Sequence, residues 1–295
     1  MPIEAETIQL GERVSIPDTV TIKARSVTIG DDVTIGEGTI VEVAGDFSLG
    51  RCSILGPRNT VRGMSVRIGE YAYTREDVEL GGGGCYSHPD SRILIGHSFF
   101  SGEGSVLNCA RRLTIGNEVG LGANVGLWTH GGYLNSLRGY PSSFEPVAIG
   151  SYVWIPGSSN VLPGVTIGSN VVVGMGSLIN RDLPSGCLAG GTPAKVIREN
   201  LYPQTLSMTA ITDLIYSWLE IIEWKTGTKP PTTGYQSCVI VEGVTFDFST
   251  LQTDRSDLNP IAEDFRNYCR QRGVRFRTGK PYQTLQPQEV KQWLS

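Results

Sequence analysis

The sequence lacks the features that direct a protein into or across a membrane. No stretch approaches the ~18 consecutive apolar residues of a spanning helix. The first residues, Met-Pro-Ile-Glu-Ala-Glu, have neither a basic flank nor an apolar run, so no signal peptide is expected. The six cysteines are scattered without a CxxC pair, which favours reduced thiols over a disulfide framework or a zinc site. We therefore expect a cytoplasmic protein that holds no metal.

Charge and histidine are also sparse. Charged residues make up 18 % of the 295 residues, and the formal net charge is −4, so nothing draws the whole chain toward nucleic acid or an anionic membrane. The sequence has only three histidines, His88, His97 and His130. Any imidazole chemistry must therefore come from one of these three side chains.

Glycine, by contrast, is abundant, with 37 residues, and it recurs after an aliphatic residue at regular intervals. Successive pairs are separated by 19, 20, 19, 27, 20, 34 and 18 residues, so most intervals lie near three hexapeptides. The pairs are Leu10-Gly11, Ile29-Gly30, Leu49-Gly50, Ile68-Gly69, Ile95-Gly96, Ile115-Gly116, Ile149-Gly150 and Ile167-Gly168.

The six-residue period predicts a parallel β-helix from about Ile8 to Pro184. Each hexapeptide would form a short strand and a turn, and three would form one triangular coil. The first residue of each hexapeptide would point inward, and so would the fifth, which must be small because it lies near a corner. The glycine at the second place is expected to serve a turn with positive φ. No coil can bury its own core, so stability must come from neighbouring coils.

Two insertions interrupt this period, at residues 74–92 and 131–146. Loops that leave a rigid scaffold often carry function, although a tolerated surface decoration explains them equally well.

The pattern changes after Arg198, and we expect a β-helix domain over residues 1–199 and a small α+β domain over 200–295. Apolar residues between Ile211 and Ile222 recur at helical spacing. Asn259-Pro260 is typical of a helix start, and Gly273 of a helix end. Strands are expected at 238–242, 244–248 and 274–277, and a short helix at 287–294.

A local basic cluster also lies in this second domain. It suits a phosphate or an acidic partner such as an acyl carrier protein, although a solvated face balanced by nearby acids is the more ordinary explanation. The cluster consists of Arg270, Arg272, Arg275, Arg277 and Lys280.

The run VWIPGSSNVLPGVTIGSNVVVGMGSLINRDLPSGCLAGGTPAKVIR, from Val153 to Arg198, resembles the hexapeptide-repeat acyltransferases. The likeness extends from about Arg92 and is greatest to the maltose and galactoside O-acetyltransferase branch. It implies a left-handed parallel β-helix that assembles as a homotrimer. It also implies transfer of an acetyl group from acetyl-CoA to a hydroxyl or amine of a small acceptor.

The resemblance assigns the catalytic general base to His130. A sugar hydroxyl is a weak nucleophile, and neutral imidazole, with an ordinary pKa of ~6.5, removes its proton near neutral pH. No covalent enzyme intermediate is needed, and a backbone N–H is enough to stabilise the developing oxyanion. A hydrogen-bonding histidine with a structural role is the alternative for a lone residue beside a loop.

The resemblance also places coenzyme A along the outer face of the last coils. The matching positions are Trp154, Gly157, Met175, Asn180, Arg181, Lys195 and Arg198. The period supports part of this set independently, because Gly157 and Met175 each lie eight residues after an Ile-Gly isoleucine and so belong to one column. Arg181, Lys195 and Arg198 would meet phosphates, or would be ordinary surface charge.

The acceptor side departs from the sugar-acetylating branch. Gly102 stands where that branch has an asparagine, and Cys109 stands near the place of an acidic residue. Glu103 or Glu145 is also a candidate to orient His130. The candidates for acceptor contacts are Glu103, Tyr133, Asn135, Arg138, Tyr140 and Glu145.

Three other functions remain to be weighed. A β-helical carbonic anhydrase needs three histidines on a metal, and the spacings of 9 and 33 residues here do not suit such a site. A non-catalytic trimeric scaffold would bind no coenzyme A. N-acetylation of an amino-sugar nucleotide is disfavoured because no GxGxxG turn precedes the repeat.

Overall fold

The computed structural model describes residues 3–227, 234–235 and 238–283, and it divides the chain into two compact units. The first unit spans Met1–Pro203 and the second Gln204–Ser295, so the boundary lies four residues beyond the predicted one. Each unit is described by itself. No helix among the described residues has the length and apolar character that crossing a membrane requires.

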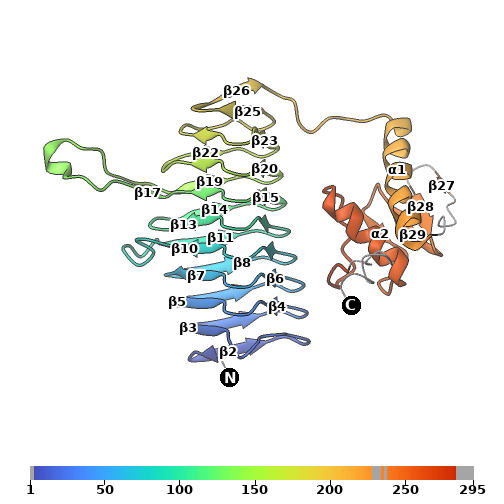
Figure 1. Cartoon of the computed structure of the whole chain (residues 1–295), viewed down its shortest axis with the longest axis horizontal. Helices are drawn as coiled ribbons and strands as arrows, with labels where there is room; N and C mark the ends of the chain where they lie inside the picture. The colour runs from blue at the N-terminus through green and yellow to red at the C-terminus, as the bar shows by residue number, and fades with distance from the viewer. Residues whose placement is uncertain (1–2, 228–233, 236–237, 284–295) are drawn as a thin grey trace. The chain divides into compact units, whose positions relative to one another are not determined.

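The first unit is a parallel β-helix whose coils stack in chain order (Figure 1). One 15-stranded sheet forms two faces, because the long strands β3 and β5 continue around a corner. Its strands are β1 (Ile3–Glu4), β2 (Thr7–Leu10), β3 (Thr21–Ile29), β5 (Ile40–Leu49), β7 (Thr60–Gly63), β8 (Ser65–Ile68), β10 (Glu79–Gly81), β11 (Arg92–Ile95), β13 (Val106–Asn108), β14 (Leu113–Ile115), β16 (Gly126–Leu127), β19 (Val147–Ile149), β21 (Asn160–Val161), β22 (Thr166–Ile167) and β24 (Leu178–Ile179).

A nine-stranded sheet forms the third face. It ends in an antiparallel hairpin of β25 and β26, which closes the last coil. Its strands are β4 (Thr34–Ile35), β6 (Ile54–Leu55), β9 (Tyr73–Thr74), β12 (Phe100–Ser101), β15 (Val119–Leu121), β20 (Val153–Ile155), β23 (Val171–Val173), β25 (Leu188–Gly191) and β26 (Ala194–Arg198).

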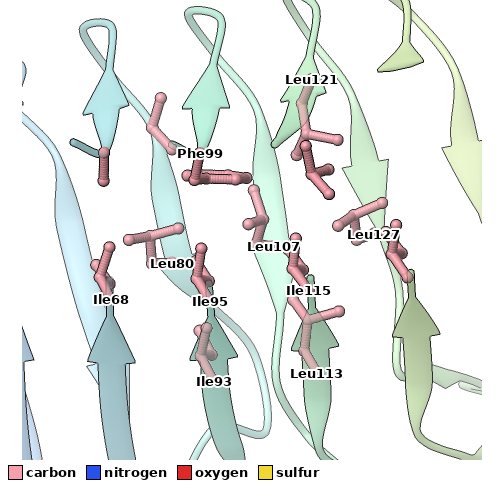
Figure 2. Packing of buried hydrophobic residues seen from close by; sticks show 14 of the residues in the cluster. Ile68, Leu80, Ile93, Ile95, Phe99, Leu107, Leu113, Ile115, Leu121 and Leu127 are labelled. Atoms are coloured by element: carbon pink, nitrogen blue, oxygen red, sulfur yellow. The ribbon is translucent and has the colours of Figure 1, made fainter. Parts of the chain in front are cut away.

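The register confirms the predicted repeat. Ile95 pairs with Ile115, Ile115 with Ile149, and Ile149 with Ile167, so the isoleucines of successive Ile-Gly pairs stack. Figure 2 shows how these side chains and those of the other faces fill the prism in rows. Fifth-place residues such as Val153, Ser159, Val165 and Ser177 are buried as well. One coil's interior is therefore completed by the coils on either side of it.

The explanation offered for the second-place glycines is wrong. None of the three at Gly96, Gly116 and Gly150 has positive φ; the left-handed residue lies two places later, as at Glu118 (φ 59°) and Tyr152 (φ 59°). What excludes a side chain at the glycines is the next coil. A Cβ on Gly116 would lie 2.7 Å from the carbonyl carbon of Gly150, and one on Gly150 would lie 2.7 Å from the backbone nitrogen of Ser169. Glycine is needed here for close approach, not for a left-handed turn.

Both insertions leave the prism, but the first is shorter than predicted. Strand β10 and the last residue of β9 lie inside the expected range 74–92 and continue the ladders, so only residues 82–91 depart. The second insertion forms an arm that projects from the coils (Figure 1). Its base is the antiparallel pair β17 (His130–Gly131) and β18 (Ser143–Phe144), and its tip holds the short helix η1 (Ser136–Arg138).

The described residues of the second unit form two helices and a four-stranded antiparallel sheet. Ser207 caps α1 and Asn259 caps α2 by accepting a backbone hydrogen bond, which confirms the predicted helix start at Asn259-Pro260. The elements are α1 (Met208–Thr226), β27 (Gly234–Tyr235), β28 (Cys238–Val241), β29 (Val244–Asp247), β30 (Gln252–Thr253) and α2 (Pro260–Gln271). The strand expected at 274–277 is not formed, and the helix expected at 287–294 lies outside the described residues.

The apolar core of the second unit forms between α1, α2 and the sheet. Phe246 packs edge-on against both Phe265 and Phe276, with ring centroids 5.1 Å apart in each pair. The segment after α2 therefore contributes the side chain of Phe276 to this core, but its backbone pairs with no strand of the sheet.

Replacing Leu80 by alanine tests the packing of the prism. Leu80 is fully buried between Leu107 and the preceding coil, so its truncation should cost ~2–5 kcal/mol of unfolding free energy. Hydrogen–deuterium exchange of β7, β10 and β13 measures the loss within this unit. Leu10→Ala is the control, since Leu10 is 42 % exposed. Equal losses in the two variants would contradict a core that depends on stacking between coils.

Candidate active site

His130 lies where the arm leaves the β-helix. Strand β16 ends at Leu127, and the next two side chains are anchored before the chain turns outward. Trp128 Nε1 donates to Asn160 Oδ1 at 2.9 Å, and the Thr129 carbonyl accepts from the Glu145 N–H at 3.0 Å. Both legs of the arm are thus fixed at its base, which places a half-buried imidazole on the outer surface of a rigid coil.

One polar and one aromatic neighbour hold the imidazole. His130 Nδ1 lies 2.9 Å from Asn108 Oδ1, and the His130 ring stacks on the Phe144 ring with centroids 5.7 Å apart at 28°. The guanidinium of Arg111 covers Phe144, with its central carbon 5.1 Å from the ring centroid. The Nε2 atom of His130 has no hydrogen-bond partner among the described residues, so the imidazole is anchored on one side and available on the other.

Asn108 is a site residue that the sequence reasoning missed. Its side chain is 1 % exposed and makes four contacts: with the Gly83 carbonyl, the Ala110 N–H, the Thr129 hydroxyl and His130. The signal that could have found it is the coil register. Leu107 pairs with Leu127, so Asn108 lies one coil below Trp128 and next to the residues that lead into His130.

The carboxylates proposed to orient His130 do not contact it among the described residues. Glu103 lies in a turn with its carboxylate 3.8 Å from Arg75 Nε. Glu145 is exposed at the base of the arm, beside Gly164. The residue bonded to His130 Nδ1 is instead the neutral amide of Asn108.

The other acceptor candidates lie along the arm. Tyr133 is 99 % exposed, and Asn135 caps η1 by accepting the Leu137 N–H at 3.0 Å. Arg138 is the last residue of η1, and Tyr140 follows it, 47 % exposed. The arm that carries these four residues projects away from the coils (Figure 1).

The candidates for coenzyme A contacts occupy the exposed surface of the last coils. Strand β20 pairs with β23 at an offset of 18 residues, and the Gly176 N–H donates to the Gly157 carbonyl at 3.1 Å, so Met175 lies one coil beyond Gly157. Trp154 is 41 % exposed and Met175 78 % exposed, so both side chains offer apolar surface to a ligand. Asn180 is exposed at the end of β24.

Three cations of the last coils have no ion-pair partner within the described residues. Arg181 follows β24, while Lys195 and Arg198 lie on β26, and all three are exposed. The backbone N–H of Gly157 likewise makes no hydrogen bond with the described part of the chain, so it is available to an incoming oxygen. The surface therefore offers apolar area, positive charge and one backbone donor.

The remaining histidines and the cysteines have other roles. His88 Nδ1 accepts the Asp90 N–H at 3.0 Å within a local turn, and His97 Nδ1 accepts the Glu70 N–H of the neighbouring coil at 3.1 Å. All six cysteines lie in described segments and are free thiols. Burial raises the pKa of Cys109, the cysteine next to Asn108, to about 12, so it is protonated near neutral pH and is a poor nucleophile.

Members of the basic cluster in the second unit have local partners. Arg270 and Arg272 stack over Tyr282 and Tyr268, at 5.1 and 3.4 Å from the ring centroids, and Lys280 pairs with Asp257. These contacts within the unit favour a structural role over a phosphate site.

Comparison with known proteins relates one segment of the chain to a family. The model for the bacterial transferase hexapeptide (six repeats) matches residues 146–181, which contain β19 to β24. Over this segment the chain is similar to the hexapeptide-repeat transferases. The matched segment includes Trp154, Gly157, Met175 and Asn180, and it begins just after the arm that carries His130.

Two curated relatives extend the likeness. A provisionally named acetyltransferase of Saccharomyces cerevisiae is 38 % identical over 117 residues, which cover 39 % of this chain and 59 % of the relative. The galactoside O-acetyltransferase of Escherichia coli is 35 % identical over 149 residues, which cover 47 % of this chain and 66 % of the relative. This hexapeptide-repeat chain therefore spans less than two thirds of either relative.

Among solved structures, a hexapeptide-repeat acetyltransferase of Vibrio cholerae complexed with acetyl coenzyme A is 27 % identical. The alignment covers 52 % of this chain and 70 % of that one, with a TM-score of 0.37.

Thiol labelling tests the assignment of the cysteines. At pH 8, iodoacetamide should modify the half-buried Cys238 of the native protein and leave Cys109 intact, because Cys109 is fully buried and its pKa is about 12. Peptide mass spectrometry measures both sites, and labelling in denaturant, where all six thiols should react, is the control. Faster modification of Cys109 than of Cys238 would show that the site contains a reactive thiolate.

Proposed function

We propose that this protein is a cytoplasmic acetyltransferase that moves an acetyl group from acetyl-CoA to a hydroxyl of a sugar-like acceptor. The observation that carries the proposal is the imidazole of His130. It is bonded through Nδ1 and open at Nε2, and it precedes in sequence the family-matched segment, which carries exposed apolar side chains. The O-acetyltransferase name of the Escherichia coli relative supports a hydroxyl acceptor.

The chemistry requires one base and one oxyanion donor. The acceptor hydroxyl gives its proton to His130 Nε2 as its oxygen attacks the thioester carbonyl carbon. The carbonyl oxygen becomes an oxyanion, and we assign the backbone N–H of Gly157 as the donor that stabilises it. When the tetrahedral intermediate collapses, the C–S bond breaks and the coenzyme A thiolate takes the proton from the imidazolium. The products are the acetyl ester and free coenzyme A, and the imidazole returns to its neutral form.

The same surface provides the means of holding coenzyme A. The pantetheine arm is extended and suits the column formed by Gly157 and Met175 beside Trp154. Its phosphates suit Arg181, Lys195 and Arg198, which have no carboxylate partner among the described residues. We further propose a homotrimer, in which the arm of one subunit meets a neighbouring subunit, since Tyr133 and Leu137 of the arm are almost fully exposed in the single chain.

Replacing His130 by alanine should lower the rate of acetyl transfer by ~10²–10⁴-fold, because the acceptor hydroxyl loses its base. Free-thiol release with acetyl-CoA and a panel of sugar acceptors measures the rate. Calorimetry should show that affinity for coenzyme A survives. His97→Ala is the matched control, since His97 only accepts a backbone N–H. Near-normal turnover in His130→Ala would refute the assigned base, and a wild type active only with an acetylated carrier protein would refute the donor.

Replacing both Lys195 and Arg198 by alanine should raise KM for acetyl-CoA about tenfold or more, with kcat nearly unchanged. Each cation contributes to binding the phosphates but does not touch the reacting atoms. Steady-state kinetics at two salt concentrations measure the effect, and the salt dependence of KM should weaken in the variant. Arg13→Ala, which removes an exposed cation near the start of the β-helix, is the control. An unchanged KM would place the phosphates elsewhere.

A further inference from the structure

We infer that Asn108 is the positioning residue for His130, and that the first inserted loop holds Asn108 in the required orientation. This inference rests on the proposed function and deepens it. The structure shows a continuous set of contacts from the Gly83 carbonyl, through the Asn108 amide, to His130 Nδ1. Neither the family match, which begins at residue 146, nor the sequence pattern assigns a role to Asn108 or to this loop.

The orientation of the Asn108 amide is determined by two backbone groups. The Gly83 carbonyl can only accept, and it lies 2.8 Å from Asn108 Nδ2. The Ala110 N–H can only donate, and its nitrogen lies 3.2 Å from Asn108 Oδ1. Both contacts demand the same orientation, with Nδ2 toward the loop and Oδ1 toward the coil that leads to His130. If the amide were flipped, its Nδ2 would face the Ala110 N–H and its Oδ1 would face the Gly83 carbonyl. Neither pair could then form a hydrogen bond.

The fixed amide determines which nitrogen of His130 carries the proton. Oδ1 is an acceptor, so His130 Nδ1, at 2.9 Å, must donate to it. In the neutral ring the lone pair then resides on Nε2, which is the nitrogen left open. The Thr129 hydroxyl supports the arrangement: it accepts the Arg111 N–H at 3.1 Å and donates to Asn108. If the lone pair of His130 were on Nδ1 instead, it would point into the coil.

The loop that supplies the Gly83 carbonyl is itself anchored. The Cys85 N–H donates to the Gly82 carbonyl at 3.2 Å, the Ser87 hydroxyl donates to the Gly84 carbonyl at 2.6 Å, and the Ser91 hydroxyl donates to the Ala110 carbonyl at 3.1 Å. Gly82 and Gly84 both have φ of 82°, which favours glycine. A Cβ on Gly82 would lie 3.6 Å from Asn108 Nδ2, so the backbone passes close to the amide it holds.

Burial explains why Asn108 is suited to this role. Asn108 is 1 % exposed, so water does not compete for either end of its amide. An unpaired amide in such a place is costly, which makes the paired orientation strongly preferred. The contact with His130 is therefore stiff, and a stiff contact sets both the tautomer and the plane of the ring before an acceptor arrives.

Replacing Asn108 by alanine should lower kcat ~10–100-fold while KM for acetyl-CoA changes little, because the ring loses the partner that fixes its tautomer and plane. Asn108→Asp should recover only a part of kcat, since a carboxylate also accepts from Nδ1–H but has no donor for the Gly83 carbonyl. The added negative charge favours the imidazolium, so the acid limb of the kcat/KM profile should move to higher pH in Asn108→Asp. A purely structural asparagine would not shift that limb.

Asn59→Ala is the matched control. Asn59 is equally buried, and its side chain contacts Thr74 and the Val78 N–H in an earlier coil, away from His130. It should lower the unfolding midpoint about as much as Asn108→Ala and leave kcat unchanged. If Asn108→Ala has normal kcat while His130→Ala is inactive, the positioning role is wrong and the proposed function stands. If His130→Ala is also active, the proposed function itself fails.

The loop's part in the inference is tested by a double-mutant cycle. Gly82→Ala strains the backbone at a φ of 82° next to the Gly83 carbonyl, so it should lower kcat severalfold in the wild-type background. In the Asn108→Ala background the same change should have almost no further effect, because the amide it disturbs is gone. Gly38→Ala, at a φ of 68° in another turn of the β-helix, is the control for strain alone. Additive losses in kcat would show that the loop does not act through Asn108.

Discussion

The backbone pairing between successive coils is the constraint on which the rest of this structure depends. Parallel strands pair at a separation of about 4.8 Å, so every residue has a fixed neighbour one coil away. Residues with the same place in the period therefore stack: isoleucine on isoleucine in the core, and glycine against glycine where Gly116 meets Gly150. The position of a residue in the sequence therefore determines its position along the prism, and this holds for functional residues as well as for core residues.

Much of the fold could be predicted because the hexapeptide period determines where each residue lies in the β-helix. The inward positions, the pairing of Ile-Gly units and the column of Gly157 and Met175 all follow from counting residues. The reason for the second-place glycines could not be obtained in this way. A turn preference is a property of one residue, whereas the close approach of Gly150 to Ser169 is a property of two coils. Similarly, Phe276 enters the core of the second unit without the strand pairing that its sequence suggested.

The candidate site also contains residues that the sequence indicates and residues that only the stacking of coils reveals. His130 could be predicted because histidine is rare here and this one stands where the period breaks. Asn108 could not be predicted from its local sequence, since its role depends on the coil above, which carries Thr129 and His130, and on a loop that leaves the coil below. Their charge favoured Glu103 and Glu145 as partners of His130, whereas the partner in the structure is the buried neutral amide of Asn108.

A neutral partner has a physical consequence that a carboxylate would not have. A carboxylate beside Nδ1 would stabilise the imidazolium and favour a protonated resting state, whereas an amide fixes the tautomer without adding charge. The neutral ring, which is the form that accepts a proton, then carries its lone pair on Nε2. Unlike a carboxylate, however, an amide can bind Nδ1–H in only one of its two flipped orientations, because one end donates and the other accepts. The Gly83 carbonyl removes that ambiguity, so the first insertion matters to the base although it lies two coils away from it.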